Sequence, residues 1–252
     1  MTVQLALTPD GRWGFPTAEF ASAANAAGFT ALGIHIERVD EAASAAYASA
    51  GVRSHELLAL VVGDDDSATM SAAERLADAA KTMNAEWVLT VFTTVPSAKI
   101  VARCAGMFDT AAAGMAVEFS PLGPVASIRH GMEIVRAANH GGRAGLLIDS
   151  WHFSFGESMW GDLSTIPLDD IAYVQFTDAL EPEFRDRLVR ESLHRRTLPG
   201  EGILELRRFA ATLLERGWDG LVSVEVLSAE LRELPVDVLT GRLYATTAPY
   251  WI

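Results

Sequence analysis

The feature that most constrains the fold of this chain is a regular series of short apolar runs, rich in valine, isoleucine and leucine. Eight such runs are present, at residues 3–7, 31–36, 57–62, 87–92, 115–119, 145–148, 171–176 and 221–226. Runs of this length and composition are typical of buried β-strands. We therefore predict a strand at each of them.

Longer segments with apolar residues at helical spacing lie between the runs. The clearest are residues 18–27, 42–50, 71–83, 97–113, 125–139, 204–216 and 236–247. Gly28, Gly51 and Gly217 each follow one of these segments where a helix C-cap is expected. Ser71 and Glu74 have the spacing of a capping box, so we expect a helix to begin at Ser71 and the acidic segment 63–67 to be a solvated loop.

Strands that alternate with helices pair in parallel through right-handed crossovers. Eight such units in about 250 residues fit a single (β/α)₈ TIM barrel. A doubly wound open sheet is the alternative, but residues 7–11 after the first run do not form a glycine-rich phosphate loop. Because no linker or second composition regime divides the chain, we predict one α/β domain over residues 1–252.

Composition excludes several classes of protein. The net charge of −13 argues against duplex nucleic acid or an anionic membrane as a partner. The single cysteine, Cys104, excludes an internal disulfide and fits a reducing compartment. With no signal-peptide pattern and no uncharged apolar run of about 18 residues, we expect a cytoplasmic protein. Such barrels commonly form homo-oligomers, and the aromatic end of the chain, residues 250–252, would suit an interface.

Oxygen-donating side chains end four consecutive predicted strands, the fifth to the eighth. They are Glu118, Asp149, Gln175 and Glu225. The carboxyl ends of barrel strands meet at one mouth, where active sites form. Carboxylates leaving apolar runs are costly unless they are paired or bound to a metal. The set therefore predicts a divalent-metal site, with Mn²⁺ or Mg²⁺ favoured and Co²⁺ or Zn²⁺ as alternatives. The alternative interpretation is that each residue separately caps a helix or pairs with an arginine.

The chain around these positions resembles the xylose-isomerase-like TIM barrel superfamily. The resemblance lies in residues 116–121, 147–153, 173–178, 223–226 and 195–202, and it follows the element order of nearly the whole chain. It implies an enzyme related to sugar phosphate isomerases and epimerases, inosose isomerases and dehydratases, and 3-dehydroshikimate dehydratases.

Transferred residue by residue, the resemblance implies three roles. The family's metal ligands fall on Glu118, Asp149, Gln175 and Glu225. Its substrate-binding histidine falls on His152, three residues after the aspartate. The arginine that contacts a substrate oxygen or anion falls on Arg196, with Arg195 as the alternative.

Two positions depart from the pattern of ketose epimerases. Gln175 stands where those enzymes have a histidine ligand, and no acidic residue follows Glu118 within residues 119–124. Dehydroshikimate dehydratases often have a histidine two residues after the first ligand, where this chain has Ser120. Both branches therefore stay open.

The resemblance implies proton transfer next to a carbonyl of a small polyhydroxylated keto substrate. The metal would polarise the carbonyl and stabilise the enediolate, and Glu118 or Glu225 would be the catalytic base. Exchange on two faces would make the protein an isomerase or epimerase. Expulsion of a β-hydroxyl with His152 as the acid would make it a dehydratase, a lyase of inosose or 3-dehydroshikimate type. Arg196 would orient a remote substrate group.

Two other functions belong to different classes. The same barrel serves abasic-site endonucleases, but these need further histidine ligands on the early strands and a basic surface, and the chain shows neither. A non-catalytic ligand-binding barrel is the other, and the presence of all four candidate ligands argues against it. His55 and Cys104 are expected to be structural.

Overall fold

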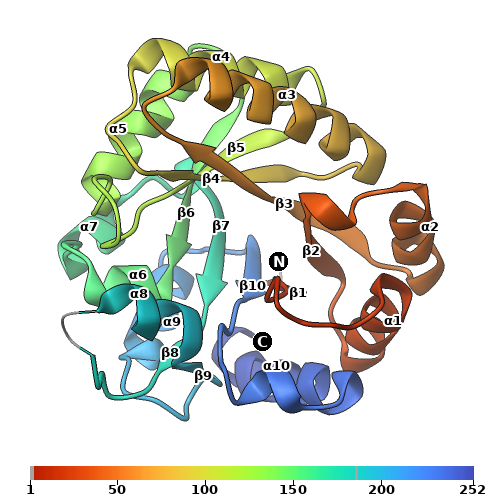
Figure 1. Ribbon diagram of the computed structural model, residues 1–252. Helices are drawn as coiled ribbons and strands as arrows, with labels where there is room; N and C mark the ends of the chain where they lie inside the picture. Colours follow the sequence, from red (N-terminus) through yellow and green to blue (C-terminus); the bar gives the residue numbers. More distant parts are fainter. Residues whose placement is uncertain (1–2, 185–186) are drawn as a thin grey trace.

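A computed structural model describes residues 3–184 and 187–252 and shows a closed barrel of parallel strands (Figure 1). The barrel strands are β1 (Gln4–Leu7), β2 (Ala31–His35), β3 (Arg53–Val62), β4 (Trp87–Phe92), β5 (Gly114–Glu118), β6 (Ala144–Asp149), β7 (Ile171–Phe176) and β10 (Leu221–Val224). Each pairs with the next in this order, and β10 closes on β1. All of the strands predicted from the apolar runs are present, and the prediction of an α/β TIM barrel is confirmed.

Helices follow the strands and surround the barrel (Figure 1). They are α1 (Thr17–Ala27), α2 (Glu41–Ala50), α3 (Asp66–Met83), α4 (Ala98–Asp109), α5 (Ile128–Ala138), α6 (Ser150–Phe155), α7 (Trp160–Thr165), α8 (Leu188–His194), α9 (Leu206–Leu214) and α10 (Val236–Trp251). No helix within residues 3–184 and 187–252 is long and apolar enough to cross a membrane. Short 3₁₀ turns occupy Ile36–Arg38, Leu168–Asp170 and Leu231–Glu233.

The expected start of α3 at Ser71 is wrong. The helix begins at Asp66, and the Asp65 carboxylate caps it by accepting hydrogen bonds from the backbone N–H groups of Ser67 and Ala68. Residues 63–65 of the acidic segment thus precede the helix, as expected of a loop, and only Asp66 and Ser67 lie in its first turn. The Ser71 hydroxyl, inside the helix, accepts a hydrogen bond from Arg75 at 3.1 Å.

Strand β3 begins at Arg53, four residues before the apolar run that predicted it. The added residues include Ser54, His55 and Glu56, which are all buried. His55 and Glu56 are compatible with burial because they hydrogen-bond across the barrel interior to Ser223 and Thr8, whereas the Ser54 hydroxyl has no hydrogen-bond partner among the described residues. A search for apolar runs does not find such residues.

Between β7 and β10 the chain makes an excursion over the mouth of the barrel. It contains α8 and a small antiparallel pair formed by β8 (Asp178–Ala179) and β9 (Arg196–Thr197). The Asp178 carboxylate accepts hydrogen bonds from the backbone N–H groups of Gly200, Gly202 and Leu204, at 3.0, 3.1 and 2.9 Å. A Cβ at Gly202 would lie 2.3 Å from the carbonyl oxygen of Ala179, so this close approach requires glycine.

The C-terminal aromatic residues pack on their own chain. Trp251 is 4% exposed, and its ring lies 5.2 Å from that of Phe176 in the core. Tyr250 also stacks on Phe176, with 5.3 Å between the ring centroids. Trp251 therefore serves the core of its own chain, and a homo-oligomer stays a prediction.

Candidate active site

The four predicted metal ligands all lie at the carboxyl end of the barrel. Glu118 and Asp149 are the last residues of β5 and β6, Gln175 lies near the end of β7, and Glu225 directly follows β10. Asp149 and Gln175 are partners in register across β6 and β7. All four residues are buried. Parallel pairing brings these strand ends to one mouth, as the sequence predicts.

His152 stands in the first turn of α6, beside Glu118. Asp149 caps this helix, because its Oδ1 accepts hydrogen bonds from the backbone N–H groups of Trp151 and His152. His152 Nε2 lies 3.5 Å from Glu118 Oε1, and its Nδ1 lies 3.2 Å from Ser120 Oγ. One ligand atom from each of Glu118, Asp149 and His152 falls within 4.8 Å of the others, a spacing that could hold a metal ion.

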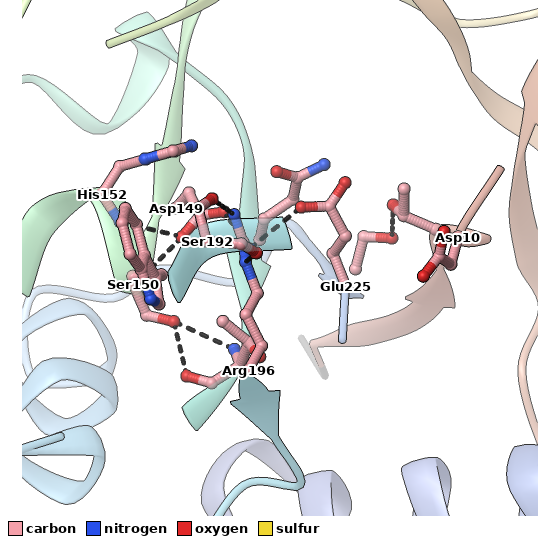
Figure 2. Close-up of polar contacts among 12 residues, drawn as sticks. Asp10, Asp149, Ser150, His152, Ser192, Arg196 and Glu225 are labelled. Atoms are coloured by element: carbon pink, nitrogen blue, oxygen red, sulfur yellow. Dashed lines mark hydrogen bonds and ion pairs between the residues drawn. The ribbon is translucent and has the colours of Figure 1, made fainter. Parts of the chain in front are cut away.

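Arg196 is buried between two of the carboxylates. Figure 2 shows its guanidinium with Asp149 on one side and Glu225 on the other, and its Nη1 lies 2.7 Å from Asp149 Oδ2 and 3.0 Å from Glu225 Oε2. Its Nε and Nη2 donate to the backbone oxygen and hydroxyl of Ser192. Arg195, the alternative, forms ion pairs with Glu183 and Glu191 instead. The structure therefore brings Arg196, and not Arg195, to the predicted site.

Burial and mutual repulsion dominate the electrostatics of this cluster. Burial, together with the charges of Glu225 and Asp149, raises the pKa of Glu118 well above its usual value. Burial raises the pKa of Glu225 to about 8. Burial acts most strongly on Asp149 and by itself would raise its pKa. The charges of Arg196 and His152, with the hydrogen bonds from the Arg196 side chain and the His152 backbone N–H, together hold that pKa below its usual value. One arginine thus does not neutralise three carboxylates, and a divalent cation would complete the balance.

Gln175 carries an acceptor atom without a partner. Its Nε2 donates to Glu56 Oε2 at 3.4 Å, while its Oε1 is buried and has no hydrogen-bond partner. Buried acceptors without partners are uncommon and call for an explanation. A carbonyl oxygen beside three carboxylates is the donor set that divalent cations such as Mn²⁺ and Mg²⁺ prefer. The residues present therefore fit the divalent metal that the sequence predicts.

Glu56 is the residue of this region that sequence reasoning missed. It is fully buried in the barrel and accepts hydrogen bonds from the hydroxyls of Thr8 and Tyr173 and from Gln175. Burial raises its pKa to about 7, although these hydrogen bonds act in the opposite direction. The one signal for it in the sequence was a charged residue directly before an apolar run.

A cavity of about 310 Å³ opens onto the cluster. Its polar lining includes Glu118, His152, Arg196 and Glu225, and apolar side chains such as Phe92 complete the wall. The volume lies at the lower end of the range of small-molecule sites. A larger cavity of about 860 Å³ lies along α8 and is lined by none of these four residues.

Comparisons with known proteins show the family of this chain. The family model described as xylose isomerase-like TIM barrel matches residues 12–240, and the chain belongs to this family. Two 3-dehydroshikimate dehydratases, from Pseudomonas putida and Pseudomonas aeruginosa, are 34% identical over 105 residues and 32% identical over 120 residues. These matches cover 40% and 44% of this chain but only 16% and 18% of the two relatives.

Solved structures share the fold over nearly the whole chain. The IolI protein with a bound zinc atom has a TM-score of 0.84 at 18% identity, covering 98% of both chains. A D-allulose 3-epimerase from Methylomonas has a TM-score of 0.74 at 15% identity, covering 99% of this chain and 98% of the epimerase. A fusion of a xylose isomerase-like barrel with a 4-hydroxyphenylpyruvate dioxygenase has a TM-score of 0.86 at 19% identity, covering 98% of this chain and 42% of the fusion.

Proposed function

We propose that this protein is a divalent-metal-dependent isomerase or epimerase that moves a proton next to the carbonyl of a small polyhydroxylated ketone, such as a sugar, a sugar phosphate or a cyclitol. The observation that carries the proposal is the convergence of three buried carboxylates and the unpaired Gln175 Oε1 at one barrel mouth, open to a cavity. The imidazole of His152 lies beside them.

Glu118, Asp149, Gln175 and Glu225 would hold the metal. A bound divalent cation would polarise the substrate carbonyl and stabilise the negative charge that develops on its oxygen. Arg196 keeps Asp149 and Glu225 in place through its paired N–H groups. A guanidinium has five N–H donors, so one remains for a substrate oxygen.

Glu118 and Glu225 are the candidate bases. They come from β5 and from the end of β10, which are separated in the barrel by β6 and β7. Without a bound cation, burial raises the pKa of each carboxyl, with the charges of Glu225 and Asp149 adding to the effect at Glu118. A carboxylate beside the substrate carbon is suited to accept a proton as a general base. Two such groups on different sides of a bound substrate would allow removal and return of a proton on opposite faces, which is epimerisation.

Dehydration of a cyclic polyhydroxy ketone is the second candidate function. The relatives matched by sequence are named as 3-dehydroshikimate dehydratases, which favours this branch. Burial lowers the pKa of His152 to about 4, so the imidazole is neutral at pH 7 and its N–H can donate to a leaving hydroxyl. The dehydratase differs from the isomerase only in losing that hydroxyl after the same proton transfer.

Deuterium incorporation tests both candidates. The purified protein is analysed for bound metal and then incubated in D₂O with ketoses, inososes and dehydroshikimate, and the products are followed by NMR. We expect deuterium at the carbon next to the carbonyl, loss of this exchange after chelation, and recovery with Mn²⁺. Products that keep every hydroxyl identify an isomerase or epimerase, whereas loss of water identifies a dehydratase.

The variant Glu225→Gln should lose both metal and exchange, because it removes one ligand and one candidate base. Glu215→Gln, an exposed position, is the matched control and should behave like the wild type. Undiminished turnover after complete chelation would rule out the metal-dependent mechanism. Absence of exchange and product with every substrate would instead support a non-catalytic ligand-binding barrel.

A further inference from the structure

The side-chain amide of Gln175 has two possible orientations, which exchange the places of its nitrogen and its oxygen. The amide nitrogen and oxygen are similar in size, so packing alone distinguishes them poorly. Hydrogen bonding must make the choice. In the structure Gln175 Nε2 lies 3.4 Å from Glu56 Oε2, and Oε1 has no hydrogen-bond partner.

Glu56 belongs to a layer of polar side chains beneath the carboxylate cluster. It is fully buried, and the hydroxyls of Thr8 and Tyr173 donate to its two oxygens. Thr8 Oγ1 lies 2.7 Å from Ser223 Oγ, which lies 3.0 Å from His55 Nε2. Because the Thr8 proton is given to Glu56, Thr8 must accept from Ser223, and Ser223 must accept from His55.

This chain of hydrogen bonds has one direction, and it ends on Glu56. The carboxylate is therefore held at a fixed place by Thr8, directly after β1, and by groups from β3, β7 and β10. Both of its oxygens accept from hydroxyl groups, an arrangement that suits the ionised form, and an ionised carboxylate only accepts hydrogen bonds. An amide oxygen turned toward it would be repelled, so the amide nitrogen of Gln175 faces Glu56 and its oxygen is left free.

From this geometry we infer that Glu56 is a positioning residue: it orients the Gln175 amide so that Oε1 is presented as a metal ligand. The inference rests on the proposed function, since it concerns the metal of that same site. Groups that hold metal ligands from behind typically change metal affinity by about 10- to 100-fold when they are replaced. It also explains how a glutamine, with its ambiguous amide, can take a ligand position.

A double-mutant cycle on metal affinity tests this role. Mn²⁺ binding to the metal-free protein is measured by calorimetry for the wild type, Glu56→Gln, Gln175→Ala and the double variant. The glutamine at position 56 can donate to Gln175 Oε1 and turn it away from the cluster. We expect Glu56→Gln to weaken Mn²⁺ binding by about 10- to 100-fold in the wild type. In the Gln175→Ala background the same substitution should have no further effect.

The possible outcomes separate this inference from the proposed function. If the wild type binds Mn²⁺ and Glu56→Gln binds it with the same affinity, the positioning role is overturned and the proposed metal site is unaffected. An equal loss in both backgrounds would show that Glu56 acts through its charge or through folding, which also overturns the role. If the wild type binds no Mn²⁺, the proposed metal site fails and the inference fails with it. Circular dichroism of each variant confirms that the comparison is made on folded protein.

Discussion

At the scale of single residues, surroundings decide what each polar group does. His55 is an example, because it is fully buried near the N-terminal end of β3. Its ring packs edge-on against Tyr173 with 5.4 Å between centroids, and its Nε2 contacts Ser223. Burial, with a smaller contribution from the charge of Arg53, lowers its pKa to about 3. The folded protein therefore holds this imidazole in the neutral form.

This neutral histidine makes stability depend on pH. Unfolded His55 takes up a proton near its ordinary pKa of 6.5, whereas the folded protein does so only near pH 3, so folding is disfavoured as the pH falls through this window. At about 1.4 kcal/mol per pH unit, the change from pH 7 to pH 5 costs about 2 kcal/mol. Between pH 7 and pH 5 the free energy of unfolding should therefore fall by about 2 kcal/mol more in the wild type than in His55→Gln. Urea denaturation at both pH values measures this difference.

The control is His140→Gln, at an exposed position outside the hydrogen-bond network that joins His55, Ser223, Thr8 and Glu56. Its stability should follow the wild type at both pH values. Parallel curves for His55→Gln and the wild type would show that His55 does not titrate differently on unfolding.

Residues differed in how far the sequence predicted them. The four strand-end donors and His152 were predictable because their place follows from the run that precedes them and from parallel topology. Glu56 was not, because its hydrogen-bond partners Thr8, Tyr173 and Gln175 come from strands distant in the chain. A buried charge of this kind is identified by the partners that satisfy it.

At the scale of elements, apolar periodicity predicted which segments are helices better than where they begin. The glycine C-caps are confirmed at Gly28 and Gly51, which have left-handed backbone. The prediction is wrong for Gly217, because α9 ends at Leu214 and its C-cap is Glu215, although Gly217 also has a positive φ. The start of α3 was wrong because Asp65 and Ser71 both suit an N-cap locally. The earlier start buries Thr69 and places it in the first turns of the helix, near the backbone N–H of Gly63. Contact with the rest of the fold thus selects Asp65.

Capping at Asp65 leads to a prediction for a pair of variants. Asp65→Ala removes an acceptor for two N–H groups and should lower the free energy of unfolding by about 1 kcal/mol. Ser71→Ala, in the interior of the same helix, should leave it nearly unchanged. Urea denaturation of the two variants and the wild type measures both values. A larger loss of stability for Ser71→Ala than for Asp65→Ala would show that the helix is capped at Ser71 after all.

At the scale of the whole molecule, the excursion between β7 and β10 completes the site. Arg196 lies on β9, and the antiparallel contact with β8 holds that strand in place. Asp178, on β8, is 1% exposed and accepts three backbone N–H groups from the segment that follows β9. This carboxylate therefore ties the segment after β9 to β8, directly after β7, and Figure 1 shows β8 and β9 beside each other.

The variant Asp178→Asn should loosen this connection. In Asp178→Asn an amide NH₂ group replaces one of the two accepting oxygens, so a donor then faces backbone N–H donors. We expect this to lower the free energy of unfolding by about 2 kcal/mol. Gly200 and Gly202 donate to one oxygen of Asp178 and Leu204 donates to the other, so faster hydrogen exchange is expected at the N–H groups that face the new amide nitrogen. Asp219→Asn, an exposed position, should change neither measurement. Unchanged exchange at the three N–H groups in Asp178→Asn would mean that the segment is held by other contacts.

The sequence by itself determined the barrel, the strand ends that carry oxygen donors and the class of chemistry that such a set supports. These follow from local patterns and from the rule that parallel strands place their carboxyl ends together. Only the tertiary structure decided that Arg196 pairs with Asp149 and Glu225 while Arg195 turns to other partners, and that Glu56 stands behind Gln175. The physical reason is that burial and hydrogen bonding between distant segments set the charge and orientation of a polar group, and local sequence does not encode those partners.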